Sequence, residues 1–349
     1  MPRVFIVSDI HYAGPAEQAR PFHELRSVAN PVLRQALRLY RNHVWLKNPL
    51  AHNPLLDRFL ERARGADYVV ANGDYACNSS FTGLSDDAAF ESARICLEKL
   101  SSAFKPRFQA TIGDHELGKL SLVGNTGGMR LESWRRTTRD FGIEPFWQVT
   151  MGNHLLIGIC SSLVAFPVLE PESLSEERPG WRELRAAHLE DIRRAFDCLR
   201  QGQRVVLFCH DPTALPFLLD EEPVRRNLAR LELTIIGHLH SPLVLWKSRM
   251  LSGMPAVRFL GNSVRKFSSA LRQPRHWKAF NVHLCPSLAG IELLKDGGFL
   301  ELQLDDDRPA LVTRHRIPRV KGAHSFKSPP AFQIVFVSMP GLHFFKTTH

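Results

Sequence analysis

Five apolar, strand-like runs in this sequence each end at residues that commonly bind metal ions, and this pattern constrains the fold more than any other feature. The first run covers residues 4–7, and its length and abrupt polar end are typical of a buried strand. Open α/β sheets bind ligands at the carboxyl ends of their strands, so the five clusters are expected to meet at one edge. In chain order the clusters are Asp9-x-His11, Gly73-Asp74, Gly113-Asp114-His115-Glu116, His210 and Gly237-His238-x-His240.

The residue types in these clusters indicate transition-metal binding. Carboxylates combined with imidazoles suit Mn, Fe, Zn, Co or Ni better than Ca or Mg. One cluster alone is weak, because a single histidine at a strand end is more often structural, but five in order are not easily explained that way. The candidates are too many for one tetrahedral zinc, and they suit two ions about 3.5–4 Å apart that share a carboxylate. The seven candidate ligands are Asp9, His11, Asp74, Asp114, His210, His238 and His240.

The ordered series resembles the calcineurin-like metallophosphoesterase superfamily over roughly residues 1–265. The resemblance implies an α/β fold: a four-layer α/β/β/α sandwich in which two mixed sheets pack face to face. It implies that His115 is the acid that protonates the leaving group. It also divides the ligands into Asp9, His11 and His240 for the first metal, Asp74 as the bridge, and Asp114, His210 and His238 for the second.

Two positions depart from the pattern of that superfamily. Asp114 stands where Asn is usual, and it adds a negative charge to the site. The second acid that phosphoprotein phosphatases carry after the bridging Asp is absent from residues 73–77, which argues against that branch and leaves the role of Glu116 open. The added charge suggests a preference for diesters or pyrophosphates, or a mixed trivalent–divalent iron-containing pair.

The function expected from these residues is phosphoester hydrolysis by a dinuclear metal site, with in-line attack by a metal-bridging hydroxide. The substrate would be a phosphorylated small molecule or a lipid-linked phosphate. One alternative is a metal-dependent nuclease that uses the basic run at residues 265–278. Another is a binding scaffold without catalysis, which the full set of competent ligands disfavours.

The chain is expected to divide into three parts. Residues 1–265 would form the catalytic domain, with a helical insertion at about residues 15–64. Residues 266–320 would be a β-rich extension that completes or flanks the second sheet, with strands at 280–285, 290–294, 299–304 and 311–315 and a hairpin turn at 296–298. Residues 321–349 would be a basic tail.

Within the insertion, residues 30–47 predict a basic amphipathic helix. Apolar residues recur at helical spacing on one side, with arginines elsewhere around the helix. Such a helix commonly covers a sheet. The other interpretation is a lid or a membrane-surface helix, since basic amphipathic helices bind anionic interfaces. Peripheral membrane contact is therefore one open expectation for this chain.

The composition indicates a basic surface and a reducing cellular compartment. Lys and Arg number 45 against 35 Asp and Glu, a formal charge of +10 that favours anionic partners without identifying one. The six cysteines form no C-x-x-C pair and are expected to be buried thiols in a reducing compartment. The apolar run at residues 4–7 is too short for a signal peptide, and no stretch approaches a membrane span, so the expected location is the cytoplasm.

Overall fold

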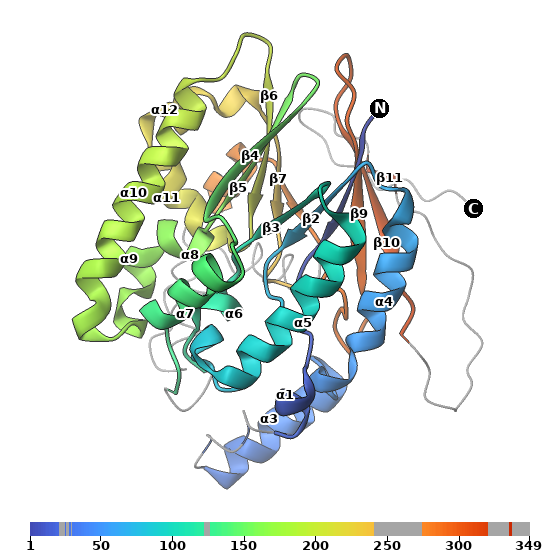
Figure 1. Cartoon of the computed structure of the whole chain (residues 1–349), viewed down its shortest axis with the longest axis vertical. Helices are drawn as coiled ribbons and strands as arrows, with labels where there is room; N and C mark the ends of the chain where they lie inside the picture. Colours follow the sequence, from blue (N-terminus) through green and yellow to red (C-terminus); the bar gives the residue numbers. More distant parts are fainter. Residues whose placement is uncertain are drawn as a thin grey trace.

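The computed structural model describes residues 1–20, 25, 28, 30–121, 126–240, 274–319 and 335–336. Its centre consists of two mixed sheets (Figure 1). In the first sheet the strand order is β11-β10-β9-β1-β2-β3. Strand β1 pairs in parallel with β2 and antiparallel with β9. The strands are β1 Arg3–Val7, β2 Tyr68–Asn72, β3 Phe108–Thr111, β9 Gly298–Gln303, β10 Leu311–Arg316 and β11 Val335–Phe336.

The second sheet has the order β4-β5-β6-β7-β8. Its first two strands form an antiparallel hairpin, and the remaining neighbours pair in parallel. The strands are β4 Phe146–Met151, β5 His154–Ile159, β6 Arg204–Cys209, β7 Leu231–Ile236 and β8 Val282–Leu284.

Alternation along the strands builds two separate cores. In β1, Val4 and Ile6 join a cluster that also contains Leu156 and Phe208 of the second sheet. The intervening Phe5 and Val7 belong to the other cluster, which includes helical residues. Since successive side chains of a strand point to opposite faces, one face of the first sheet packs on the second sheet and its other face packs on helices. The predicted α/β/β/α sandwich is confirmed.

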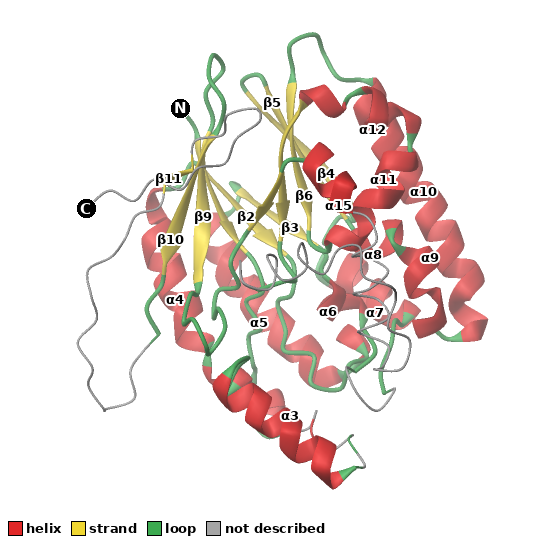
Figure 2. Cartoon of the chain, turned by 180° about the vertical axis from the view of Figure 1, so that it is seen from behind, coloured by secondary structure: helices red, strands yellow, loops and turns green. Residues whose placement is uncertain are grey.

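Helices cover the outer faces of both sheets, as Figure 2 shows from behind. Phe59 of α4 packs edge-on against Phe299 of β9, and His188 of α10 lies against Phe146 of β4. The α-helices are α1 Pro15–Gln18, α3 Pro31–His43, α4 Asn53–Arg62, α5 Asp87–Phe104, α6 Asp114–Leu117, α7 Leu131–Arg135, α8 Ser161–Val164, α9 Phe166–Leu169, α10 Arg178–Asp197, α11 Leu215–Asp220, α12 Glu222–Arg226 and α15 Pro274–Ala279.

Short helical turns connect these elements. A π-helical turn, η4 Arg136–Asp140, continues α7. The 3₁₀ turns are η1 Pro49–Ala51, η2 Ala63–Gly65, η3 Gly83–Ser85, η5 Glu170–Glu172, η6 Ser175–Glu177, η7 Pro212–Ala214 and η8 Leu228–Arg230. Within the described residues, no helix combines the length and apolar character needed to cross a bilayer.

The segment after residue 265 divides between the two sheets. Strand β8 pairs with β7 in the second sheet, whereas β9 pairs with β1 and thereby extends the first. The strand expected at 290–294 is wrong: residues 292–294 form a turn. Gly290 has a φ of +64°, and the N–H of Ile291 donates to Asp296 Oδ1 at 3.0 Å. The Gly290 conformation and this hydrogen bond close a local loop, so the expected hairpin at 296–298 does not form. Strand β9 is instead antiparallel to β10.

Two further expectations concern cysteines and the tail. Four cysteines are buried and none forms a disulfide, but Cys198 is exposed and Cys77 is half-buried, so burial of all six is wrong. Cys198 directly follows α10 as its C-cap residue. The tail at 321–349 and most of the basic run at 265–278 lie outside the described residues, apart from β11 and α15.

Candidate metal centre

The structure brings all eight predicted site residues to the carboxyl ends of β1, β2, β6 and β7 and to the first turn of α6. Two groups of ligand atoms form there, one around Asp114 and one around His11. The backbone at these positions is unusual. Five of the seven predicted ligands have positive φ angles between 48° and 60°: Asp9, His11, Asp74, His238 and His240. Non-glycine residues rarely adopt this conformation, and it concentrates at functional sites.

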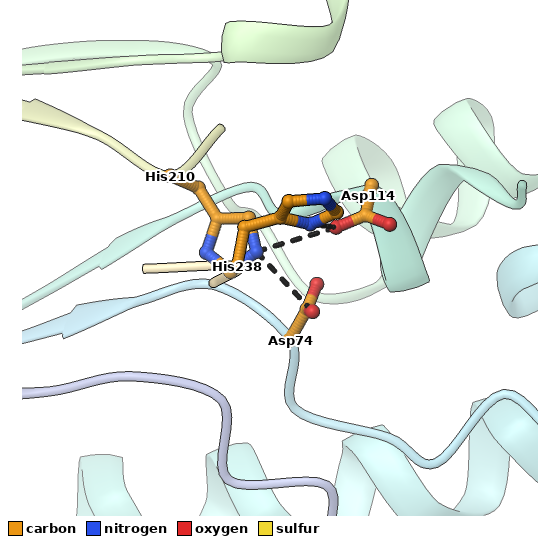
Figure 3. A group of neighbouring side chains, drawn as sticks. All are labelled: Asp74, Asp114, His210 and His238. Atoms are coloured by element: carbon orange, nitrogen blue, oxygen red, sulfur yellow. Dashed lines mark hydrogen bonds and ion pairs between the residues drawn. The ribbon is translucent and has the colours of Figure 1, made fainter. Parts of the chain in front are cut away.

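The first group consists of Asp74, Asp114, His210 and His238, whose ligand atoms all lie within 4.8 Å of one another (Figure 3). His210 Nε2 is 3.2 Å from Asp74 Oδ2 and 3.3 Å from Asp114 Oδ1. His238 Nδ1 is 2.9 Å from the same oxygen of Asp114. The Nδ1–H of His210 donates to the carbonyl of Asn72, which leaves Nε2 facing the carboxylates.

The second group consists of Asp9, His11 and His240. The Nε2 atoms of the two histidines are 3.2 Å apart, and His240 Nε2 is 3.3 Å from Asp9 Oδ1. Burial lowers the pKa of His11 to about 4 and lowers that of His240 well below its usual range. Both imidazoles are therefore neutral near pH 7, the form in which histidine binds metal ions.

Asp74 connects the two groups. It belongs to the first group and also forms a third with His11 and His115. Gly73 makes this position possible: with φ at +87°, its backbone suits glycine, and a Cβ there would lie 2.7 Å from His210 Nδ1. The Gly-Asp pair at the end of β2 therefore sets a carboxylate between the two histidine-rich groups.

Metal ions fit this donor set. Asp74 Oδ2 and His210 Nε2 of the first group are buried without a hydrogen-bond partner, which is costly unless a ligand satisfies such atoms. Burial opposes a charge on His210, yet Asp74 and Asp114 raise its pKa well above the usual value. Three carboxylates lie close together in a buried space and therefore stabilise positive charge nearby. Bound cations would provide that charge.

Two buried residues, Glu116 and Ser8, hold the loops that carry the ligands. Glu116, whose role was open, is fully buried and accepts the N–H groups of Gly113 at 2.8 Å, Asp74 at 3.0 Å and Tyr75 at 2.8 Å. It therefore ties the loop after β2 to the start of α6. Ser8 donates from its hydroxyl to Asp9 Oδ2 at 2.6 Å. The Glu116 position just after the Asp-His pair was a signal; nothing in the sequence singled out Ser8.

Lys119 is a further residue of the site that the sequence did not single out. Its Nζ lies 2.9 Å from Asp114 Oδ2. Although burial acts in the opposite direction, Lys119 and His238 hold the pKa of Asp114 well below its usual range. Asp114, the residue that departs from the superfamily pattern, is thus paired with a cationic side chain five residues later in the sequence.

A cavity of about 740 Å³ opens over the metal centre, with His11, His115 and His240 among its walls. The helical insertion also lines this cavity, with Arg38, Arg41, Asn42 and Trp45. The Trp45 ring lies over the ring of His240, with centroids 4.6 Å apart. No substrate-binding residues were predicted from the sequence, and this cavity supplies the candidates.

No family model matches this chain, and no curated protein matches it. Solved structures do show similarity. One is a putative 5'-nucleotidase from Staphylococcus aureus, with 13% identity and a TM-score of 0.39 over 94% of this chain and 56% of that chain. A second is a purple acid phosphatase from yellow lupin, with 11% identity and a TM-score of 0.40 over 90% of this chain and 51% of that chain.

A third is a phosphopantetheinyl hydrolase from Mycobacterium tuberculosis, with 14% identity and a TM-score of 0.33 over 69% of this chain and 84% of that chain. This chain thus spans just over half the length of the first two. All three are calcineurin-like metallophosphoesterases, the superfamily that the strand-end motifs of this chain resemble.

Proposed function

We propose that this chain is a dinuclear metal-dependent phosphohydrolase that cleaves phosphoester bonds, with diesters or pyrophosphates favoured. The observation that carries the proposal is the pair of adjacent ligand groups joined by Asp74. Each group combines carboxylate with imidazole, and the cavity above them is lined by His11 and His240 of the second group and by Lys119, which pairs with Asp114 of the first. Such paired sites suit in-line displacement at phosphorus.

The ligands would divide between two ions of the Mn, Fe or Zn class. Asp9, His11 and His240 would hold the first, and Asp114, His210 and His238 the second. Asp74 would contact both, since its carboxylate belongs to a group on either side. When bound, the two cations would lower the pKa of a shared water and offset the charge that develops on the phosphoryl oxygens.

His115 is positioned to protonate the leaving oxygen. It lines the cavity, and its Nδ1 is 3.0 Å from the carbonyl of Ala76, which orients the ring. Its Nε2 lies 3.8 Å from Asp74 Oδ2, at the side of the ring nearer the metal ligands. A proton on that nitrogen can pass to an alkoxide as the P–O bond breaks.

Lys119 modifies the expectation for Asp114. Asp9, Asp74 and Asp114 together bring three negative charges, and the ammonium 2.9 Å from Asp114 returns one positive charge. Two divalent ions then suffice for a site that attracts phosphate, so a trivalent ion is not required. The favoured substrates remain phosphoesters whose reacting group carries few negative charges, because the Asp114 carboxylate still faces the second ligand group.

The decisive experiment measures metal and turnover in the same preparations. The protein is stripped with a chelator and reloaded with Mn²⁺, Zn²⁺ or Fe²⁺, and bound metal is quantified by mass spectrometry. We expect two ions per chain and hydrolysis of bis-p-nitrophenyl phosphate above that of p-nitrophenyl phosphate. No retained metal and no hydrolysis would overturn the proposal and favour the scaffold alternative.

A nuclease is the second enzymatic possibility. Its basic run lies mostly outside the described residues, so no described contact favours it. Cleavage of single-stranded DNA at a rate matching the diester assay would support that alternative. Diester hydrolysis without DNA cleavage would support the proposed function.

A further inference from the structure

Helix α3 turns its polar side toward the protein and its apolar side away from it. Arg38, Arg41 and Asn42 line the cavity above the metal centre. No residue of the helix is buried. Four of its five large apolar side chains, Val32, Leu33, Leu39 and Tyr40, are between 39% and 77% exposed, and Leu37 is half-buried. A helix on the surface of a protein normally buries its apolar side, so this orientation is the reverse of the usual one.

A second segment adds apolar side chains at the end of this helix. The N–H of Leu293 donates to the carbonyl of Val44 at 3.2 Å, which places the turn at 292–294 beside the residues that follow α3. Leu293 is 53% exposed and Leu294 is 43% exposed. Among the large hydrophobic residues that the described part of the chain exposes, only Met1 and Leu174 lie outside these two segments. We call α3 together with residues 292–294 the docking face.

The shape of the molecule leaves the docking face open to a large partner. In Figures 1 and 2, α3 protrudes from the lower end of the body, beyond the layers formed by the two sheets and their helices. Exposed apolar groups gathered in one place usually mark an interaction site, because water contact with each of them costs free energy.

Charge identifies the kind of partner. From residue 30 to residue 56 the chain contains no Asp or Glu, whereas it carries three arginines, one lysine and two histidines. Apolar side chains beside basic ones, without acidic residues, suit a surface that is apolar inside and anionic at its edge. An anionic lipid bilayer has both properties: acyl chains would receive the exposed leucines, and lipid phosphates would pair with the exposed Arg38 and Lys47, which also line the cavity.

We propose that the docking face inserts into the headgroup region of an anionic bilayer and that the enzyme takes a lipid-linked phosphoester from it. The second half of this inference rests on the proposed function. The polar side of α3 forms a cavity wall, so the cavity begins at the membrane-facing helix and reaches His11 and His240. Its other walls are both apolar and cationic, as an amphiphilic phosphate requires, and include Trp45, Leu46, Phe81, Arg20, Lys47 and Lys119.

The test of docking does not depend on catalysis. The full chain is floated with vesicles of phosphatidylcholine, and with vesicles in which part of that lipid is replaced by phosphatidylglycerol. We expect binding to the anionic vesicles, weakened by salt. The double variant Val32→Glu with Leu39→Glu should lower partitioning more than about tenfold. The matched control is Leu174→Glu, an exposed leucine elsewhere, which should bind like the wild type.

A second variant guards against a local folding defect in α3. Leu293→Glu lies outside the helix, and it should also weaken binding to anionic vesicles. Wild-type protein that does not float with anionic vesicles would overturn the proposal, as would binding that neither variant changes. Light scattering provides a further check. A wild-type dimer that both variants convert to monomer would assign the docking face to a second copy of the chain.

Activity measurements separate the two proposals. The double variant should hydrolyse soluble bis-p-nitrophenyl phosphate at the wild-type rate, because Val32 and Leu39 do not line the cavity. It should hydrolyse a long-chain alkyl nitrophenyl phosphodiester embedded in anionic vesicles at least about tenfold more slowly. Equal rates on the embedded diester would overturn the substrate assignment. Failure of every form on the soluble diester would overturn the proposed function, while vesicle binding would still decide the docking face.

Discussion

The ammonium group of Lys119 lies 2.9 Å from the carboxylate of Asp114. Asp114 opens α6 and belongs to the ligand group that includes His210 and His238. Lys119 also lines the cavity above them. The pair therefore brings opposite charges to the point where a phosphate would approach the proposed second ion, and both charges act in a site partly closed to water.

This pair predicts a charge dependence that a double-mutant cycle can measure. Lys119→Met should lower kcat/KM for the dianionic p-nitrophenyl phosphate by about tenfold more than for the monoanionic diester, because it removes one positive charge. Asp114→Asn should shift the monoester-to-diester ratio in the opposite direction. The double variant should return the ratio close to that of the wild type. Metals are quantified in each variant. A monoester-to-diester ratio in the double variant that stays far from the wild-type ratio would show that the two charges do not offset each other.

Loss of a ligand should remove metal and activity while the fold remains. Asp74→Asn and His240→Ala are each expected to reduce bound metal and to abolish measurable turnover, since Asp74 links both ligand groups. Far-UV circular dichroism should stay near that of the wild type, because both residues follow strands and do not belong to either apolar core. Asp57→Asn and His43→Ala, at exposed positions, serve as matched controls. Full metal content with wild-type turnover in either ligand variant would refute the assignment.

The role of His115 can be tested by comparing the rate loss of a variant on substrates with different leaving groups. His115→Ala should reduce the hydrolysis of an alkyl phosphodiester by about 10²–10⁴-fold, because an alkoxide needs a proton as it departs. A nitrophenyl diester should lose much less, since nitrophenolate leaves without one. The comparison uses kcat at saturating substrate for both esters, with metal content checked. Equal losses on the two substrates would assign His115 an electrostatic or structural role.

Buried His188 should make folding sensitive to acid. Burial lowers its pKa from about 6.5 to about 3, and its Nε2 accepts the N–H of Cys160 at 3.1 Å. Between those pH values the unfolded chain binds a proton that the folded chain does not. The free energy of unfolding should therefore fall on acidification, by up to about 1.4 kcal/mol per pH unit from this residue, and be unaffected by it above pH 6.5.

Urea unfolding of the metal-free protein between pH 7.5 and pH 4.5 tests this dependence. His188→Gln keeps an acceptor but cannot titrate, so its stability should depend less steeply on pH than that of the wild type. The control is His43→Gln, which replaces an exposed histidine of α3 and should leave the slope unchanged. The same slope in His188→Gln and wild type would contradict the prediction.

The sequence by itself determined the strands and the residues that end them. Apolar runs that end at polar residues are local properties, so the strands that precede Asp9, Gly73, His210 and Gly237 could be predicted from the sequence. Each strand ends where polar residues stop the buried run, and parallel neighbours end at the same edge. The eight site residues could therefore be placed together before any coordinates existed, and the structure does bring them together.

Only the tertiary structure decided which distant segments meet these residues. A turn at 292–294 stands where a strand was expected, because the N–H groups of Glu292 and Leu293 donate to the carbonyls of Trp45 and Val44. Strand β9 joined β1 in the first sheet. Asp114 forms an ion pair with Lys119, and the Glu116 carboxylate accepts hydrogen bonds from three backbone amides. Helix α3 was predicted as an amphipathic helix, but its period is the same whichever side faces the protein. Periodicity records how side chains are distributed around an element, whereas the packing of the whole chain decides which side meets water.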